Sequence, residues 1–152
     1  MAVPLHRDPP GGTPGALNVY VDSSVLLRVV LGEPGRLRIW SRIATPVATE
    51  LIRPECLRTI DRARIRFGLD DDEVATRRGA VLEAIDTFHL VPIQPAILER
   101  AGEPFPTLIG TLDALHLATA LLVRDRFEGL VLATHDRALS LAARAMGFRV
   151  HG

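Results

Sequence analysis

Residues 17–31 read LNVYVDSSVLLRVVL, where a short β-type run meets a helical segment at Asp22. A run of this length and composition predicts a buried strand over residues 17–21, and the apolar residues that follow have the spacing of a helix over residues 23–31. The turn-forming residues 32–35, GEPG, end that helix. The segment is therefore typical of the first strand and helix of an α/β fold.

The alternation continues to the end of the chain. Further strands are predicted at about residues 45–48, 88–93, 130–133 and 148–150, with helices at about 36–43, 49–67, 70–87, 95–103, 112–125 and 137–146. Thr49 and Thr111 are expected to cap the helices that they precede. Helices between strands imply parallel β-α-β units with right-handed crossovers. We therefore predict the α/β class, as a three-layer α/β/α domain over residues 17–152 with a central parallel sheet of about four to five strands.

Length and composition fit one compact domain, since 47% of the 152 residues are hydrophobic. Residues 1–16 are rich in Pro and Gly, lack the apolar run of a signal peptide, and are predicted to form a disordered leader. No stretch reaches about 18 uninterrupted apolar residues. The one cysteine cannot form an internal disulfide, which fits a reducing compartment. We expect a cytoplasmic protein with no membrane segment.

All 18 basic residues are arginine, and 18 acidic residues balance them. The absence of lysine excludes the Walker A phosphate loop, Schiff-base catalysis and phosphoaspartate sites that use a lysine. A protein that binds nucleic acid mainly by neutralising phosphates is expected to be strongly basic. A polyanionic partner of this neutral chain must therefore be held locally or through a metal ion.

Several acidic residues lie where the predicted fold has its ligand site, at the carboxyl ends of the strands. Asp22 and Asp136 follow predicted strands. Asp113 lies in the first turn of the apolar helix 112–125, and Glu55 lies in the helix after the second strand. Each aspartate could instead cap a helix, which contributes about 0.5–2 kcal/mol.

Electrostatic repulsion favours a metal site over capping. Hydroxyl caps already stand beside these positions, at Ser23, Ser24, Thr111 and Thr134. Two carboxylates about 4 Å apart repel by roughly 4 kcal/mol at an effective dielectric constant of about 20, which exceeds the gain from capping. A cluster of such oxygen ligands requires a cation, and it suits Mg²⁺ or Mn²⁺. Carboxylates that hold these ions are typical of metal-dependent phosphodiester cleavage.

The chain resembles PIN-domain ribonucleases, specifically the VapC toxins of type II toxin-antitoxin systems. The matching segments are VYVDSSVLL, ATELIRPECLR, TLDALHLATAL and VLATHDRALSLAARAMGFRV, and they follow the order and spacing of that family. The resemblance implies that the metal-binding and catalytic residues are Asp22, Glu55, Asp113 and Asp136, supported by Ser24 and Thr134. It also implies a Mg²⁺-dependent endoribonuclease, with Mn²⁺ as the alternative ion, that leaves a 5′-phosphate and a 3′-hydroxyl.

The resemblance extends to the partners. It implies an RNA substrate and a cognate antitoxin whose C-terminal segment lies over the site, often with an arginine among the carboxylates. It further implies a homodimer and a toxin-antitoxin hetero-oligomer. An arginine is a reasonable inhibitor of such a site because a guanidinium can take the place of the cation.

Glu55 is preceded by Pro54, which inside a helix removes a hydrogen bond and can kink the chain. If the helix instead restarts with Pro54 as its first residue, Glu55 lies in a first turn and still points to the strand ends. Glu50 is the alternative ligand.

Other residues are candidates for contact with the substrate or the antitoxin. The best basic and aromatic group is Trp40 with Arg36, Arg38 and Arg42. This group is open to three interpretations: RNA binding, an amphipathic helix that buries Trp40, and a groove for a partner peptide. A second group begins at Arg53 and continues with Arg58, Arg62, Arg64 and Arg66. His116 either contacts the substrate or is a buried, hydrogen-bonded residue.

Three remaining features are expected to be structural. The acidic residues 70–73 are interpreted as a solvated first turn of a helix, His135 as exposed, and Cys56 as a small buried side chain. Two other functions are open: a PIN nuclease that processes RNA outside a toxin-antitoxin pair, and an inactive binding module with the same fold. The absence of a second domain favours the toxin, and retention of mutually repelling acids favours an enzyme.

Overall fold

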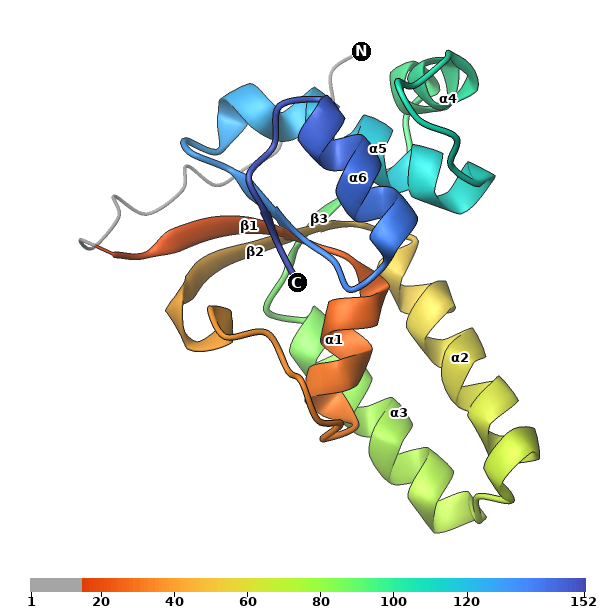
Figure 1. Ribbon diagram of the computed structural model, residues 1–152. Helices are drawn as coiled ribbons and strands as arrows, with labels where there is room; N and C mark the ends of the chain where they lie inside the picture. Colours follow the sequence, from red (N-terminus) through yellow and green to blue (C-terminus); the bar gives the residue numbers. More distant parts are fainter. Residues whose placement is uncertain (1–14) are drawn as a thin grey trace.

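The computed structural model describes residues 15–152, so the leader predicted for residues 1–16 lies, up to residue 14, outside the described residues. The strands are β1 (Leu17–Val21), β2 (Ile43–Thr49), β3 (His89–Val91), β4 (Val131–Ala133) and β5 (Val150–His151). The helices are α1 (Ser23–Val30), α2 (Ile52–Phe67), α3 (Asp71–Ile85), α4 (Pro95–Gly102), α5 (Thr111–Val123) and α6 (Arg137–Ala145). Short 3-10 helices, η1 (Trp40–Arg42) and η2 (Arg124–Arg126), complete the order in Figure 1.

The strands form one five-stranded sheet in the order β3-β2-β1-β4-β5, and every neighbouring pair is parallel. The chain moves outward from β1 through β2 to β3, and it then returns to β4 on the other side of β1. The strand order therefore reverses between β1 and β4, whose last residues, Val21 and Ala133, are paired. A parallel sheet binds its ligands outside the carboxyl ends of the strands at such a reversal.

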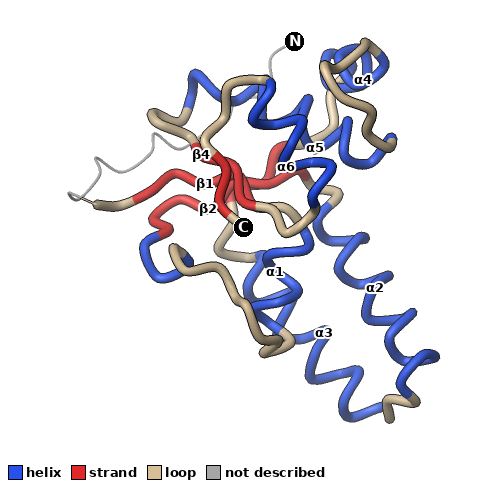
Figure 2. Tube along the Cα trace, viewed as in Figure 1, coloured by secondary structure: helices blue, strands red, loops and turns tan. Residues whose placement is uncertain are grey.

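Helices cover both faces of the sheet, as Figures 1 and 2 show, which confirms the predicted three-layer fold. α1, α2 and α3 pack on the face to which Val19 and Val21 point, and α4, α5 and α6 pack on the face to which Tyr20 points. Neighbouring residues of a strand point to opposite faces. β1 is therefore buried on both sides, which explains why its residues form a nearly continuous apolar run.

The helix predicted at residues 36–43 is wrong. Only Trp40–Arg42 form a short 3-10 helix, and Ile43 already begins β2, where it pairs with Leu17 of β1. Leu37 and Ile39 are buried in the core nonetheless. Apolar residues with helical spacing can thus pack from an irregular segment, and pairing within the sheet overrides the local pattern.

The cap predicted at Thr49 is also wrong, because Thr49 is the last residue of β2 and α2 begins at Ile52. The later start places Pro54 in the first turn of α2, where a backbone N–H has no partner within the helix. Helical hydrogen bonding resumes with the Glu55 N–H, which donates to the Leu51 carbonyl at 3.1 Å. Pro54 therefore costs α2 no hydrogen bond, and Glu55 lies in its first turn.

The starts of α3 and α5 differ in how they are capped. Asp70 accepts a hydrogen bond from the Glu73 N–H at 2.8 Å, and the Glu73 side chain accepts one from the Asp70 N–H at 3.0 Å. This capping box confirms that residues 70–73 open a helix. Thr111, by contrast, is the first residue of α5 and not its cap, which is Gly110.

We expect Asp70→Ala to lower the free energy of unfolding by about 1 kcal/mol, because it removes the side-chain half of the capping box. Urea denaturation monitored by circular dichroism measures this loss. Asp72→Ala is the matched control, since it removes an exposed acid from the same turn and leaves both hydrogen bonds of the box. An equal loss in both variants would assign the effect to charge at the helix N-terminus and not to the cap.

Two further predictions concern Cys56 and the membrane. Cys56 lies on the buried face of α2 and is fully buried in the core, as predicted. Its burial, together with the charges of Glu55 and Asp22, raises the pKa of the thiol to about 12, so it is not a nucleophile at neutral pH. Among residues 15–152, no helix has the length and apolar character needed to cross a membrane.

Candidate metal centre

Asp22 is fixed at the carboxyl end of the central strand. It occupies the N-cap position of α1, but its side chain makes no capping hydrogen bond. Instead, Oδ2 accepts hydrogen bonds from the Ser24 hydroxyl at 2.6 Å and from the Thr134 hydroxyl at 2.8 Å. Thr134 reaches Asp22 because it directly follows β4, the neighbour of β1. The buried carboxylate is thus held by two hydroxyls and leaves Oδ1 on the side of α2 and α5.

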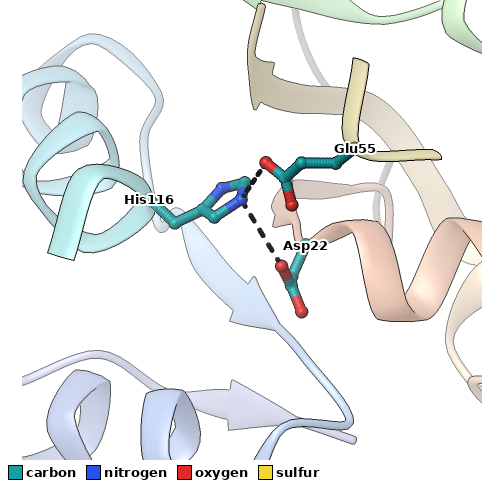
Figure 3. A group of neighbouring side chains, drawn as sticks. All are labelled: Asp22, Glu55 and His116. Carbon is teal, nitrogen blue, oxygen red and sulfur yellow. Dashed lines mark hydrogen bonds and ion pairs between the residues drawn. The ribbon is translucent and has the colours of Figure 1, made fainter. Parts of the chain in front are cut away.

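Glu55 approaches Asp22 from the first turn of α2, as Figure 3 shows. Its Oε2 accepts a hydrogen bond from the Ser23 hydroxyl at 2.9 Å, and its Oε1 lies 2.7 Å from Nε2 of His116. His116 comes from α5, and the same nitrogen lies 3.7 Å from Oδ1 of Asp22. The strand end, α2 and α5 therefore each bring one ionisable side chain to the same point.

A chain of hydrogen bonds holds His116 from behind. The Tyr20 hydroxyl lies 2.9 Å from Nδ1 of His116, and it accepts a hydrogen bond from the Thr49 N–H at 3.3 Å. Because a carboxylate can only accept, His116 must carry a proton on Nε2 and donate it to Glu55. The chain therefore links the backbone of β2, through β1 and α5, to the Glu55 carboxylate.

Burial and charge act in opposite directions on His116. Burial lowers the pKa of His116, but the hydrogen bond to Glu55 and the negative charges of Glu55, Asp22 and Asp113 outweigh it, and the pKa lies above its usual value. The pKa of Tyr20 is raised well above its usual value, chiefly by burial. Tyr20 is therefore a neutral hydroxyl, which accepts from the Thr49 N–H and shares a hydrogen bond with Nδ1 of His116.

Asp22, Glu55 and His116 form a group that could hold a metal ion. One oxygen or nitrogen atom of each lies within 4.8 Å of those of the other two, and since Nε2 of His116 donates its proton to Glu55, the two carboxylates are the ligands in this arrangement. The two carboxylates are the hard oxygen donors that Mg²⁺ and Mn²⁺ prefer. Both are also oriented by hydrogen bonds from neighbouring side chains, which is typical of metal ligands in proteins. The donor set therefore fits a hard divalent cation.

Asp113 and Asp136, the other two predicted ligands, are not part of this group of three. Asp113 is half-buried in the first turn of α5, whereas Asp136 is exposed and caps α6 by accepting a hydrogen bond from the Leu139 N–H at 2.8 Å. Burial raises the pKa of Asp113 to about 6, and the charges of Asp136, Asp22 and Glu55 add to this effect against the opposing influence of His116. Negative charges thus repel one another at this edge, and a bound cation would relieve the repulsion.

Other predicted residues lie apart from the group. Glu50 is exposed, and its Oε1 accepts a hydrogen bond from the Ile93 N–H at 2.9 Å, so the structure brings Glu55 and not Glu50 to Asp22. Trp40 is half-buried and packs against the core on the α1–α3 face. The arginines predicted to contact the substrate or the antitoxin are exposed. They are Arg36, Arg38 and Arg42 near Trp40, and Arg53 on α2.

Neither histidine near the site is exposed to solvent as a surface contact would be. His116 is 1% exposed, so its side chain faces Glu55 and Tyr20 and not the solvent. His135 is half-buried, which corrects the prediction that it is exposed. Its backbone N–H donates to the Ser24 hydroxyl at 3.0 Å, so the turn after β4 also supports the residue that holds Asp22.

Three residues of the site were not expected from the sequence: Tyr20, Ser23 and Thr49. The available signal is the need of buried polar groups for hydrogen-bond partners. Tyr20 lies in a strand buried on both faces, and His116 lies on an apolar helix, so each requires a partner inside the protein. That need is visible in the sequence, but the pairing depends on α5 crossing β1 in three dimensions.

Comparison with known proteins identifies the family. The pattern of the PIN domain matches residues 19–145, and the chain therefore belongs to the PIN domain family. It is 32% identical to Ribonuclease VapC46 of Mycobacterium tuberculosis (strain ATCC 25618 / H37Rv) over 135 residues, which cover 87% of this chain and 95% of that protein. It is 28% identical to Ribonuclease VapC47 of Mycobacterium tuberculosis (strain CDC 1551 / Oshkosh), with 86% and 93% covered. These similarities confirm the resemblance to VapC ribonucleases.

Solved structures share the fold at low sequence identity. The crystal structure of PAE2754 from Pyrobaculum aerophilum matches with a TM-score of 0.57 and 19% identity, covering 86% of this chain and 84% of that one. A chain in the crystal structure of VapBC2 from Rickettsia felis, bound to a DNA fragment from their promoter, matches with a TM-score of 0.61 and 10% identity, covering 90% and 100%. The likeness supports the three-layer architecture.

Proposed function

We propose that the chain is a metal-dependent endoribonuclease of the VapC type, the toxin of a toxin-antitoxin pair. The observation that carries this proposal is the convergence of Asp22, Glu55 and His116 at the carboxyl edge of a PIN-domain sheet. Relatives that align over nearly their whole length are ribonucleases named VapC. This similarity favours a toxin over a nuclease of general RNA processing or an inactive binding module.

Asp22 and Glu55 would hold the ion, Mg²⁺ or Mn²⁺, and Asp113 and Asp136 would add negative charge around it. When bound, the cation neutralises charge that develops on the phosphate and lowers the pKa of water. Asp22 is kept in place by the hydroxyls of Ser24 and Thr134, and Glu55 by Ser23 and His116. Because these bonds already exist in the structure, the carboxylates need little rearrangement when the ion and the RNA bind.

The partners follow from the same proposal. They are an RNA substrate, a cognate antitoxin and a second copy of the chain. The mutually repelling carboxylates can bind a guanidinium group as well as a metal ion. An arginine of the antitoxin would therefore inhibit the enzyme by occupying the metal site. A cytoplasmic location follows from the same proposal, since an RNA substrate and a single free cysteine fit a reducing compartment.

Cleavage of end-labelled RNA tests the function. We expect cleavage by the purified protein in Mg²⁺ or Mn²⁺, no cleavage in EDTA, and recovery when the ion is restored in excess. The products should carry a 5′-phosphate, which a phosphate-specific exonuclease detects. Cleavage that continues unchanged in EDTA, or products with a cyclic phosphate, would contradict a metal-dependent hydrolysis.

A further inference from the structure

A cavity of about 430 Å³ opens beside Glu55, between the first turns of α2 and the start of α5. Ser23 and Glu55 line one end of it, and Arg58, Thr59 and Arg62 line it along α2. Residues three, four and seven positions apart lie on one face of a helix. The cavity therefore leads from the carboxylates along one face of α2, which extends away from the sheet in Figure 1.

The two arginines in this cavity are available to bind an anion. Arg58 is exposed and lies 3.7 Å from Asp61, which also pairs with Arg78 at 3.4 Å. An exposed ion pair of this kind contributes only about 0–1 kcal/mol, so a phosphate can compete for Arg58. Arg62 donates to the Thr59 hydroxyl at 2.9 Å, which is a neutral acceptor, and it forms no ion pair within residues 15–152.

The other arginines at the far end of α2 are engaged differently. Arg64 forms an ion pair with Asp71 at the start of α3, and Arg66 lies over the ring of Phe67. Neither lines the cavity, and neither does Arg53. Of the five arginines on α2, Arg58 and Arg62 are therefore the ones placed to act together with Glu55 on one ligand.

The cavity also has an apolar part. Leu51 and Pro54 line it at the start of α2, and Leu112 lines it from α5, with its side chain exposed although it is large and hydrophobic. Single-stranded RNA presents charged phosphates beside flat apolar bases, and its binding sites combine basic groups with apolar or aromatic surfaces. The volume also lies within the range of about 300–1,000 Å³ found for small-ligand sites.

We propose that this cavity is a subsite for one nucleotide of single-stranded RNA beside the scissile phosphate. Arg58 and Arg62 contact its phosphate oxygens, and Leu51, Pro54 and Leu112 contact its base. The inference rests on the proposed function, since it takes the occupant to be RNA. An antitoxin segment that carries an arginine is a poorer occupant, because Arg58 and Arg62 repel it, whereas guanidinium groups bind phosphate oxygens in pairs.

The test compares the double variant Arg58→Gln/Arg62→Gln with the control Arg126→Gln/Arg144→Gln. Both remove two exposed positive charges, but the control changes η2 and α6, outside the cavity. Binding of a fluorescein-labelled single-stranded RNA of mixed sequence is measured in EDTA over a range of salt concentrations. We expect the cavity variant to bind about tenfold more weakly, with a salt slope smaller by about 1.4, as the loss of two phosphate contacts on a single strand requires.

Cleavage in Mg²⁺ gives an independent readout. The cavity variant should raise KM and leave kcat near that of the wild type, since it removes binding and not the carboxylates. Equal weakening of RNA binding in both double variants would overturn the subsite, and so would a loss of antitoxin binding with RNA binding unchanged. Wild-type protein that binds RNA in this way without cleaving it would refute the proposed function and leave the subsite standing.

Discussion

Asp22→Asn is expected to lower the rate of RNA cleavage roughly 10²- to 10³-fold, or about 3–4 kcal/mol in the barrier. The substitution keeps the shape of the side chain but removes its charge from the point where α1, α2 and α5 converge. An amide is a weaker ligand for a hard cation than a carboxylate. The rate is measured with end-labelled RNA over a range of Mg²⁺ concentrations. The rate at saturating Mg²⁺ reports the chemical step, and the Mg²⁺ concentration needed for half of that rate reports ion binding.

Two controls distinguish loss of the metal site from loss of the fold. Asp72→Asn removes a charge from the exposed first turn of α3 and should cleave like the wild type. Mg²⁺ should raise the melting temperature of the wild type and of Asp72→Asn, but not that of Asp22→Asn, because only a protein that binds the ion is stabilised by it. An Asp22→Asn variant that cleaves RNA at the wild-type rate would contradict the assignment of the site.

The position of Asp22 could be predicted because it depends on local pattern and on a general property of parallel sheets. An apolar strand followed by a polar residue and a helix places that residue at the carboxyl end of the sheet. Asp22 and Thr134 meet because β1 and β4 are neighbours. The alternation of strands and helices predicted a parallel sheet, although it did not predict the order of the strands. The segment 36–43 could not be predicted in this way, since pairing with β1 decided where β2 begins.

The hydrogen bonds that hold the Glu55 carboxylate, unlike the position of Asp22, could not be predicted from the sequence. The local pattern places Glu55 near the start of a helix, but it does not say which side chains contact the carboxylate. The contact with His116 joins residues 61 positions apart, and the contact of His116 with Tyr20 joins residues 96 positions apart. Such contacts depend on how α2 and α5 pack across the sheet edge, which no short-range spacing encodes.

His116→Ala is expected to reduce cleavage about 10- to 100-fold, although His116 is buried and does not reach the substrate. The variant removes the donor to Oε1 of Glu55 and one of the two hydrogen bonds of the Tyr20 hydroxyl, which keeps the bond from the Thr49 N–H. Loss of a hydrogen bond inside the core costs about 0.5–1.5 kcal/mol, so the melting temperature should fall as well. His116 is thus a positioning residue, which acts on the reaction through the Glu55 carboxylate.

Conservative variants separate positioning from stability. Tyr20→Phe keeps the packing of the ring and removes only the hydroxyl, so it should lower cleavage less than His116→Ala does. His116→Gln retains an N–H donor of similar reach and should restore part of the activity. If His116 acts through Glu55, the combination of His116→Ala with Glu55→Gln should cost little more than Glu55→Gln alone, because residues in one hydrogen-bond network are not additive. Fully multiplicative losses would mean that His116 contributes to cleavage independently of Glu55.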